Sequence, residues 1–217
     1  MSFPTYAVST ELDAVNQILS SVGQAPVTTL DKQNPEVAIV VNTLREVNKM
    51  VQAEGWAFNT ETDYELVPET TTKEITYASN WLQVDPIDNV DNIDIDAIRR
   101  NGKLYDKKHH TYEFSKNIKV NITWLFDFSD VPPQIQQYIT ARAARMCATK
   151  MIGDREINAL LQEQEQLTRA MAMNYETEQG DYSFFGFENG KEQYNGFIPA
   201  DALRRWQVFP NVFLTSS

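Results

Sequence analysis

The stretch Ile118-Lys119-Val120-Asn121-Ile122-Thr123-Trp124-Leu125-Phe126-Asp127-Phe128 is the clearest β-strand in this chain of 217 residues. Its even-numbered positions are all apolar and most of its odd-numbered positions are polar, which is the two-residue period of a strand with one face on a core. Just before it, Asn101-Gly102 joins residues 97–100 to residues 103–105 and suits a type I′ hairpin turn. The centre of the chain is therefore predicted to form antiparallel β-structure.

Helical periodicity lies on both sides of this block. Before it, apolar residues recur at helical spacing over residues 10–22 and 34–54. After it, residues 130–133 open a third helix, and Asp154 caps a fourth that extends to about Gln179. We predict an α+β fold, in which a helical bundle formed by N- and C-terminal helices carries an inserted antiparallel β lobe and an extended C-terminal arm.

The predicted domain organisation follows the same order. Residues 1–55 form the N-terminal helix pair of the bundle, and residues 56–129 form the β-rich insertion lobe. Residues 130–180 supply the C-terminal helices of the bundle, and residues 181–217 form the arm.

Two finer predictions concern the lobe and the fourth helix. Within the lobe, further extended segments are expected at residues 56–58, 64–67 and 75–77. The residues expected to form the buried stripe of the fourth helix, interrupted by Gln164, are Ile157, Leu160, Leu161, Leu167, Met171 and Tyr175.

Composition argues against several classes of protein. A formal net charge of -11 argues against a protein that clamps nucleic-acid phosphates, because such proteins need clustered Lys and Arg. A DNA-binding regulator is disfavoured further, because no basic recognition helix is found. No secretory signal and no run of about 20 apolar residues appears, so we expect no membrane segment.

Residues suited to catalysis are sparse. The one cysteine, Cys147, falls in a helical pattern and is expected to be a small buried hydrophobe. His109 and His110 are adjacent in a charged, turn-like stretch, which a solvated loop explains. The sequence thus predicts no catalytic residue and no cofactor.

A run of aspartates is the one candidate for metal binding. It lacks the sixth-position glycine of a Ca²⁺-binding EF-hand loop, and Arg99 stands where the twelfth-position Glu would follow Asp88. We therefore expect a solvated loop and no metal, and if the loop faced a channel it would repel DNA phosphates. The aspartates are Asp85, Asp88, Asp91, Asp94 and Asp96.

An enzyme remains the rival class, most plausibly a glycoside hydrolase acting on host surface polysaccharide. That chemistry needs only two carboxylates at a fixed separation. With 30 Asp and Glu residues, however, such pairs occur throughout the chain and carry little diagnostic value. Trp81, Trp124 and Trp206 could stack on sugars, but core or interface positions explain them equally well.

Eight segments together resemble the tail tubular protein A family of T7-like short-tailed bacteriophages, which is the family of head-to-tail adaptor or gatekeeper proteins. They occur in the family's order from about Thr10 to Tyr182, and this order is far more specific than any one of them. The segments are Glu11-Leu12-Asp13-Ala14-Val15-Asn16 with Ile18-Leu19, Val22-Gly23-Gln24-Ala25-Pro26-Val27, Gly55-Trp56-Ala57-Phe58-Asn59, Gly102-Lys103-Leu104-Tyr105-Asp106, Val120-Asn121-Ile122, Asp130-Val131-Pro132, Leu161-Gln162-Glu163-Gln164-Glu165 and Gly180-Asp181-Tyr182.

This resemblance implies a structural virion protein and no enzymatic activity. Adaptors of this family form a dodecameric ring between the portal protein at the capsid vertex and the nozzle protein (tail tubular protein B), and tail fibres attach near that junction. Genomic DNA passes through the ring lumen without sequence-specific binding. The implied location is the virion tail at the portal vertex, after synthesis in the host bacterial cytoplasm.

The C-terminal segment departs from the family pattern. Its glycine and aromatic content predicts an extended arm that orders on a neighbouring subunit or on the portal, since aromatic and Arg side chains are common interface anchors. The alternative is a strand or two packed on the parent domain. The candidate partner-binding residues are Phe184, Phe185, Phe187, Arg204, Arg205, Trp206 and Phe209, and on the fourth helix Glu163, Glu165 and Arg169 are candidates for contacts between subunits.

Overall fold

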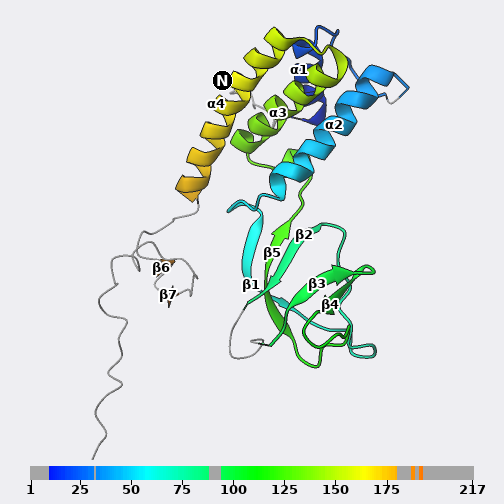
Figure 1. Cartoon of the computed structure of the whole chain (residues 1–217), viewed down its shortest axis with the longest axis vertical. Helices are drawn as coiled ribbons and strands as arrows, with labels where there is room; N and C mark the ends of the chain where they lie inside the picture. The colour runs from blue at the N-terminus through cyan, green and yellow to red at the C-terminus, as the bar shows by residue number, and fades with distance from the viewer. Residues whose placement is uncertain (1–9, 32, 88–93, 180–186, 189–190, 193–217) are drawn as a thin grey trace, which may run out of the picture. The chain divides into compact units, whose positions relative to one another are not determined.

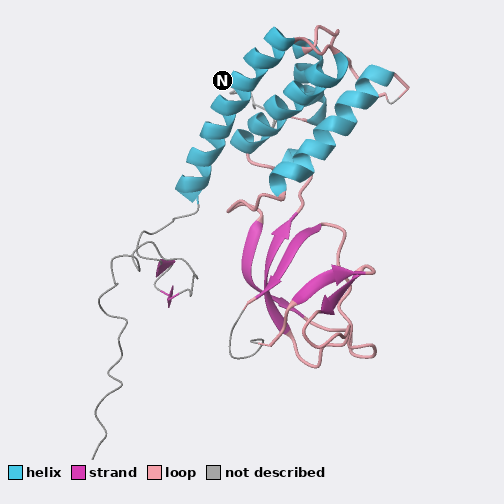
Figure 2. Ribbon diagram, viewed as in Figure 1, coloured by secondary structure: helices cyan, strands magenta, loops and turns pink. Residues whose placement is uncertain are grey.

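A computed structural model describes residues 10–31, 33–87, 94–179, 187–188 and 191–192 of the chain (Figure 1). The fold is α+β, as predicted, with four helices and short antiparallel sheets (Figure 2). The chain divides into two compact units, Met1–Tyr175 and Glu176–Ser217, and the first unit contains both the helical core and the larger sheet.

The first two helices have the ends that the sequence predicts. Helix α1 spans Glu11–Ser21, and Thr10 and Asp13 form a reciprocal capping box at its start. Helix α2 spans Pro35–Gln52, and the Asn34 side chain accepts a hydrogen bond from the backbone N–H of Glu36 at 3.0 Å. Both caps satisfy N–H groups that have no partner within the helix.

Helices α3 (Pro133–Met151) and α4 (Arg155–Gln179) form an antiparallel pair. The turn between them needs the positive φ of Gly153, +71°, which a residue with a side chain rarely adopts. Asp154 then accepts hydrogen bonds from the N–H groups of Glu156 and Ile157 and starts α4 where the sequence predicts.

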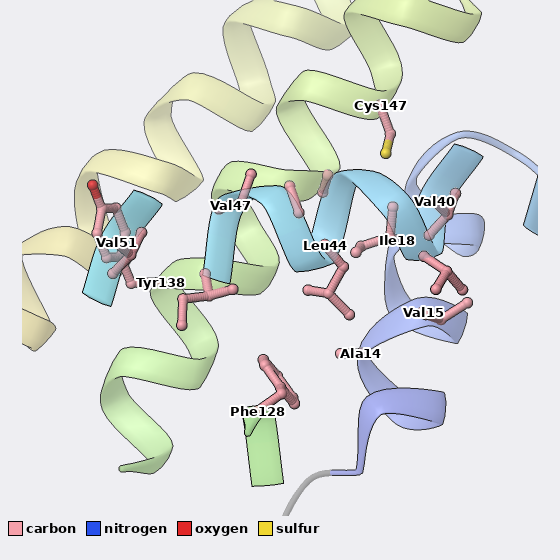
Figure 3. Close-up of a cluster of buried hydrophobic side chains, with 14 of the residues drawn as sticks. Ala14, Val15, Ile18, Val40, Leu44, Val47, Val51, Phe128, Tyr138 and Cys147 are labelled. Atoms are coloured by element: carbon pink, nitrogen blue, oxygen red, sulfur yellow. The ribbon is translucent and has the colours of Figure 1, made fainter. Parts of the chain in front are cut away.

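A hydrophobic core joins α1, α2 and α3 (Figure 3). Ile18, Leu44 and Tyr138 are among its fully buried members, and Trp56 packs edge-to-face on Tyr138 with 6.5 Å between ring centroids. Cys147 belongs to this core, and burial raises the pKa of its thiol. The expectation of a buried hydrophobe at this position is confirmed.

The larger sheet has three antiparallel strands in the order β1-β5-β2. Strand β5 (Ile118–Trp124) lies between β1 (Thr60–Leu66) and β2 (Trp81–Pro86), and its Ile118, Val120 and Ile122 are fully buried. These three side chains form, with Leu104, part of a second core that is separate from the helical one.

The predicted hairpin is confirmed. Strand β3 (Ala97–Arg100) pairs with β4 (Lys103–Asp106), and Asn101 and Gly102 adopt φ values of +52° and +72°. Positive φ at both central residues is what a type I′ turn requires.

Two local predictions about strands were wrong, and one strand was missed. The long strand ends at Trp124, and Phe128 begins a short 3₁₀ helix, η1 (Phe128–Asp130), whose Phe128 packs into the helical core. Residues 57–59 form a turn, because the Asn59 side chain accepts a hydrogen bond from the Trp56 N–H at 2.8 Å. Strand β2 was not predicted, since its polarity does not alternate cleanly.

The predicted buried stripe of α4 is confirmed for three of its six residues and wrong for the other three. Leu160 and Leu167 are 68% and 59% exposed, and Met171 is 44% exposed. Leu161 is buried, and Ile157 and Tyr175 pack against the helical core, as predicted; Ala172, which was not in the predicted stripe, is also buried. The other three residues are exposed because α4 packs on the helical core through an adjacent side of the helix, so only part of its apolar surface is covered.

Candidate assembly surfaces

The connection between the helical core and the sheet is fastened by the side-chain amide of Gln52, which is fully buried at the end of α2. Its Oε1 accepts a hydrogen bond from the Phe126 N–H at 2.8 Å, and its Nε2 donates to the Phe126 carbonyl at 2.9 Å. A single side chain thus pairs with both backbone groups of a residue 74 positions away. This contact fixes where the chain leaves the sheet.

Asn59 fixes the other connection between the helical core and the sheet, at which the chain enters the sheet. Its Nδ2 donates to the carbonyls of Gln52, at 2.9 Å, and Trp124, at 2.8 Å, and it is 1% exposed. Sequence analysis did not single out either amide. The sequence shows Gln52 only as a polar residue beside the apolar stripe of α2, and Asn59 only as part of Gly55-Trp56-Ala57-Phe58-Asn59. A hydrogen bond between residues more than 60 positions apart leaves no pattern in a sequence.

The outward face of α4 carries an uncovered apolar stripe of Leu160, Leu167 and Met171, called the α4 stripe below. These residues recur at seven and four positions and so lie along one side of the helix. Glu156 and Glu163 border the stripe and are exposed. The α4 stripe therefore has an acidic margin.

The other α4 residues predicted to lie between subunits separate into two groups. Glu165 is used within its own chain, because it is paired with Arg145 and lies 3.9 Å from the Nε of Arg142. Glu163 and Arg169 are exposed. Only these last two remain available for the predicted intersubunit role.

The outward face of α2 bears two exposed apolar residues, Ile39 and Met50, at 41% and 43% exposure. Charges of both signs lie beside them. Glu46, exposed between the two on the same side of the helix, lies 3.6 Å from the Lys150 Nζ of α3, and Lys49 is exposed on α2. Sequence analysis did not mark this face, because two isolated apolar residues form no periodic stripe.

Lysines partly neutralise the acidic run. Asp94 pairs with Lys108 and Asp96 with Lys107, each with an N···O distance of 2.6 Å, and the bond from Lys108 lowers the pKa of Asp94. Asp85 lies in β2, while Asp88 and Asp91 lie outside the described residues. Among the residues that the structure describes, no cluster of His, Cys, Asp and Glu is arranged to hold a metal ion.

His109 has a structural partner. Its Nδ1 lies 2.6 Å from the Oδ2 of the buried Asp106, which also accepts hydrogen bonds from the N–H groups of Asp96 and Lys108. Burial alone would raise the pKa of Asp106, but these hydrogen bonds outweigh it and lower the pKa. His110 is exposed and adopts a positive φ of +56°. The pattern is that of a turn stabilised by a carboxylate.

Two of the three tryptophans considered for sugar stacking are engaged in packing. Trp124 contacts both Trp81 and Tyr64 edge-to-face, with ring centroids 6.2 and 5.5 Å apart, and Trp81 contacts Tyr77 in the same way at 5.2 Å. Both tryptophans are half-buried against the core of the sheet. Trp206 lies outside the described residues.

An open groove runs between the start of α1, α2 and residues 125–129. It contains two carboxylate residues, Glu11 and Asp127. Glu11 is held by Arg45, whose Nε and Nη2 donate to its two oxygens at 2.7 and 3.2 Å. This carboxylate is part of an ion pair, which gives no support to a role as a general acid or nucleophile.

The predicted arm residues fall almost wholly outside the described part of the chain. Phe184, Phe185, Arg204, Arg205, Trp206 and Phe209 are among the residues not described. Phe187 lies in β6 (Phe187–Glu188), whose backbone pairs antiparallel with β7 (Lys191–Glu192). The partner-binding role of the seven residues stays a prediction.

These features bear on the class of protein. The described residues present exposed helix faces and a braced junction between core and sheet, and no helix among them is long and apolar enough to cross a bilayer. These features are compatible with a structural protein that works through contacts with other proteins.

The family follows from comparison with known proteins. A family described as tail tubular protein matches residues 12–182, most of the chain, and the chain belongs to that family. A comparison with individually curated proteins finds no match. The protein is therefore a structural component of a bacteriophage tail, as the resemblance in its sequence predicts.

Proposed function

We propose that this protein is the adaptor, or gatekeeper, of a short-tailed phage. Twelve copies form a ring between the portal protein and the nozzle protein at the portal vertex of the virion, beside the attachment site of the tail fibre. Genomic DNA crosses the lumen of this ring without sequence-specific binding. The family match over residues 12–182 is the observation that carries the proposal.

The fold is consistent with this role in two respects. A ring needs a heterologous interface, in which one face of a subunit meets a different face of the next. The outward faces of α4 and α2 differ in their residues and are both exposed. In addition, a channel for DNA is better served by an acidic protein than by a basic one, and the chain has a net charge of -11.

The C-terminal arm is proposed to bind the portal protein. The proposed contact residues are Phe184, Phe185, Phe187, Arg204, Arg205, Trp206 and Phe209. Deleting residues 183–217 should abolish co-sedimentation with purified portal protein. Unchanged binding of the truncated chain would refute the role of the arm.

The same preparations test the rival function. As an adaptor, the protein should release no reducing sugar from the capsular polysaccharide of a host strain. A glycoside hydrolase would release sugar, and replacement of two carboxylates by amides would stop it. Activity of that kind in a protein that ignores the portal would favour the enzyme.

A further inference from the structure

The open groove between the start of α1, α2 and residues 125–129 is large enough to hold a short peptide segment. Its volume is about 520 Å³, within the range of about 300–1,000 Å³ that is usual for binding sites. Leu44 and Phe128, which line it, lie beside the first turn of α1 (Figure 3), and Leu125 and Phe126 line it as well. Apolar side chains that face an open groove are stabilised when another apolar segment covers them.

The lining of the groove has no net charge. Glu11 and Asp127 are its acidic residues, and Arg45 and Lys49 are its basic ones. Glu11 and Arg45 are already paired with each other. A charged segment would have to bring its charge out of water without a free partner of opposite sign, so an uncharged apolar segment suits this lining better.

Residues 1–9 supply such a segment. They lie outside the described part of the chain and join it at Thr10, which itself lines the groove. Nine extended residues reach about 30 Å, which is far enough to lie along the groove. None of the nine has a charged side chain, although 23% of the residues of the whole chain are charged, and they read Met1-Ser2-Phe3-Pro4-Thr5-Tyr6-Ala7-Val8-Ser9.

The order of side chains in this segment also suits the groove. Thr10 has an extended backbone, with φ -80° and ψ 161°, and Pro4 favours an extended residue before it. Successive side chains of an extended chain point to opposite sides, so Tyr6 and Val8 share the side of Thr10. Because Thr10 lines the groove, the apolar side chains of Tyr6 and Val8 are expected on the groove side, and that of Thr5 on the outer side.

We propose that residues 4–8 lie extended in this groove, with Tyr6 and Val8 against Leu44 and Phe126, and form a strap between the start of α1 and the junction with the sheet. The strap covers Phe126, whose N–H and carbonyl are both bound by the Gln52 side chain, and shields these hydrogen bonds from water. The proposal concerns each subunit by itself and does not depend on the adaptor function.

Hydrogen exchange of the full chain, read by NMR at the backbone amide of Phe126, tests the strap. Tyr6→Asp places a charge on the groove side and should make this amide exchange at least about tenfold faster and lower Tm by at least about 3 °C. Thr5→Asp adds the same charge to the neighbouring residue, on the outer side, and should change neither quantity. Equal exchange in the two variants would overturn the proposal.

Cross-linking identifies the copy that supplies the segment. Tyr6→Cys with Lys49→Cys should form a disulfide within one chain under mild oxidation, at least about tenfold faster than Thr5→Cys with Lys49→Cys. Native Cys147 is buried and should not contribute. A disulfide-linked dimer in place of the monomer would show that a second copy fills the groove, and equal rates for the two pairs would show that the segment does not lie in it; either result contradicts the strap.

Discussion

Gln52→Leu should destabilise the protein through the junction between helices and sheet. Leucine has nearly the same volume, so the change removes the amide without opening a large cavity. It eliminates the hydrogen bond that the Gln52 Oε1 accepts from the Phe126 N–H and those that its Nε2 donates to the Phe126 carbonyl and the Asn48 side chain. The Phe126 N–H then loses its partner in a partly buried position.

The expected magnitude follows from these contacts. A buried polar group left unpaired costs about 1–3 kcal/mol. The Phe126 carbonyl keeps a weaker donor, because the Asn48 Nδ2 lies 3.4 Å from it. The total should therefore be about 2–3 kcal/mol, which for a chain of this size lowers Tm by about 4–12 °C.

Urea unfolding followed by circular dichroism measures this loss. Gln162→Leu makes the same chemical change at an exposed position of α4 and should alter the free energy of unfolding by less than about 0.5 kcal/mol. If Gln52→Leu is as mild as Gln162→Leu, the amide does not brace the junction and the reasoning fails.

Two further predictions concern carboxylates that are held within the chain. Because the folded-state pKa of Asp106 is lowered, its ionised form stabilises the protein above the unfolded pKa of about 3.9, and this contribution is lost as pH falls through the folded value. Asp106→Asn should therefore lower the free energy of unfolding by about 1–3 kcal/mol at pH 7 and flatten the acid side of a plot of stability against pH. An unchanged acid side would contradict this prediction. Glu165→Ala removes the partner of Arg145, so backbone amides of α4 should exchange with deuterium faster than in the wild type. The control Glu163→Ala, at an exposed position, should not change the exchange rate. Equal rates in both variants would show that the ion pair of Arg145 with Glu165 does not hold α4.

Local signals in the sequence predict much of the fold because they act over short distances. Asn34 and Asp154 mark helix starts by accepting hydrogen bonds from nearby backbone N–H groups, and Gly153 marks a helix end through its positive φ. Asn101-Gly102 likewise fixes its hairpin through positive φ values. Each of these structural choices is decided within a few residues.

Long-range contacts limited the rest. The apolar residues that alternate from Ile118 to Phe128 pack in two different cores. The chain leaves the sheet after Trp124, and Phe128 packs in the helical core. Periodicity cannot show where one core stops and the next begins. The buried amides of Gln52 and Asn59 escaped prediction for the same reason, since their partners are distant in sequence.

The α4 stripe shows a different limit. Sequence periodicity predicts that Leu160, Leu167 and Met171 are buried, and in one chain they are not. A sequence records the burial that the working assembly needs and does not say which chain provides it.

The most direct test of the adaptor function is the native mass of the purified protein, measured alone and after mixing with its portal protein. The 24.9 kDa chain should give a closed ring of twelve copies in at least one of the two samples. A species that remains monomeric in both would contradict the account.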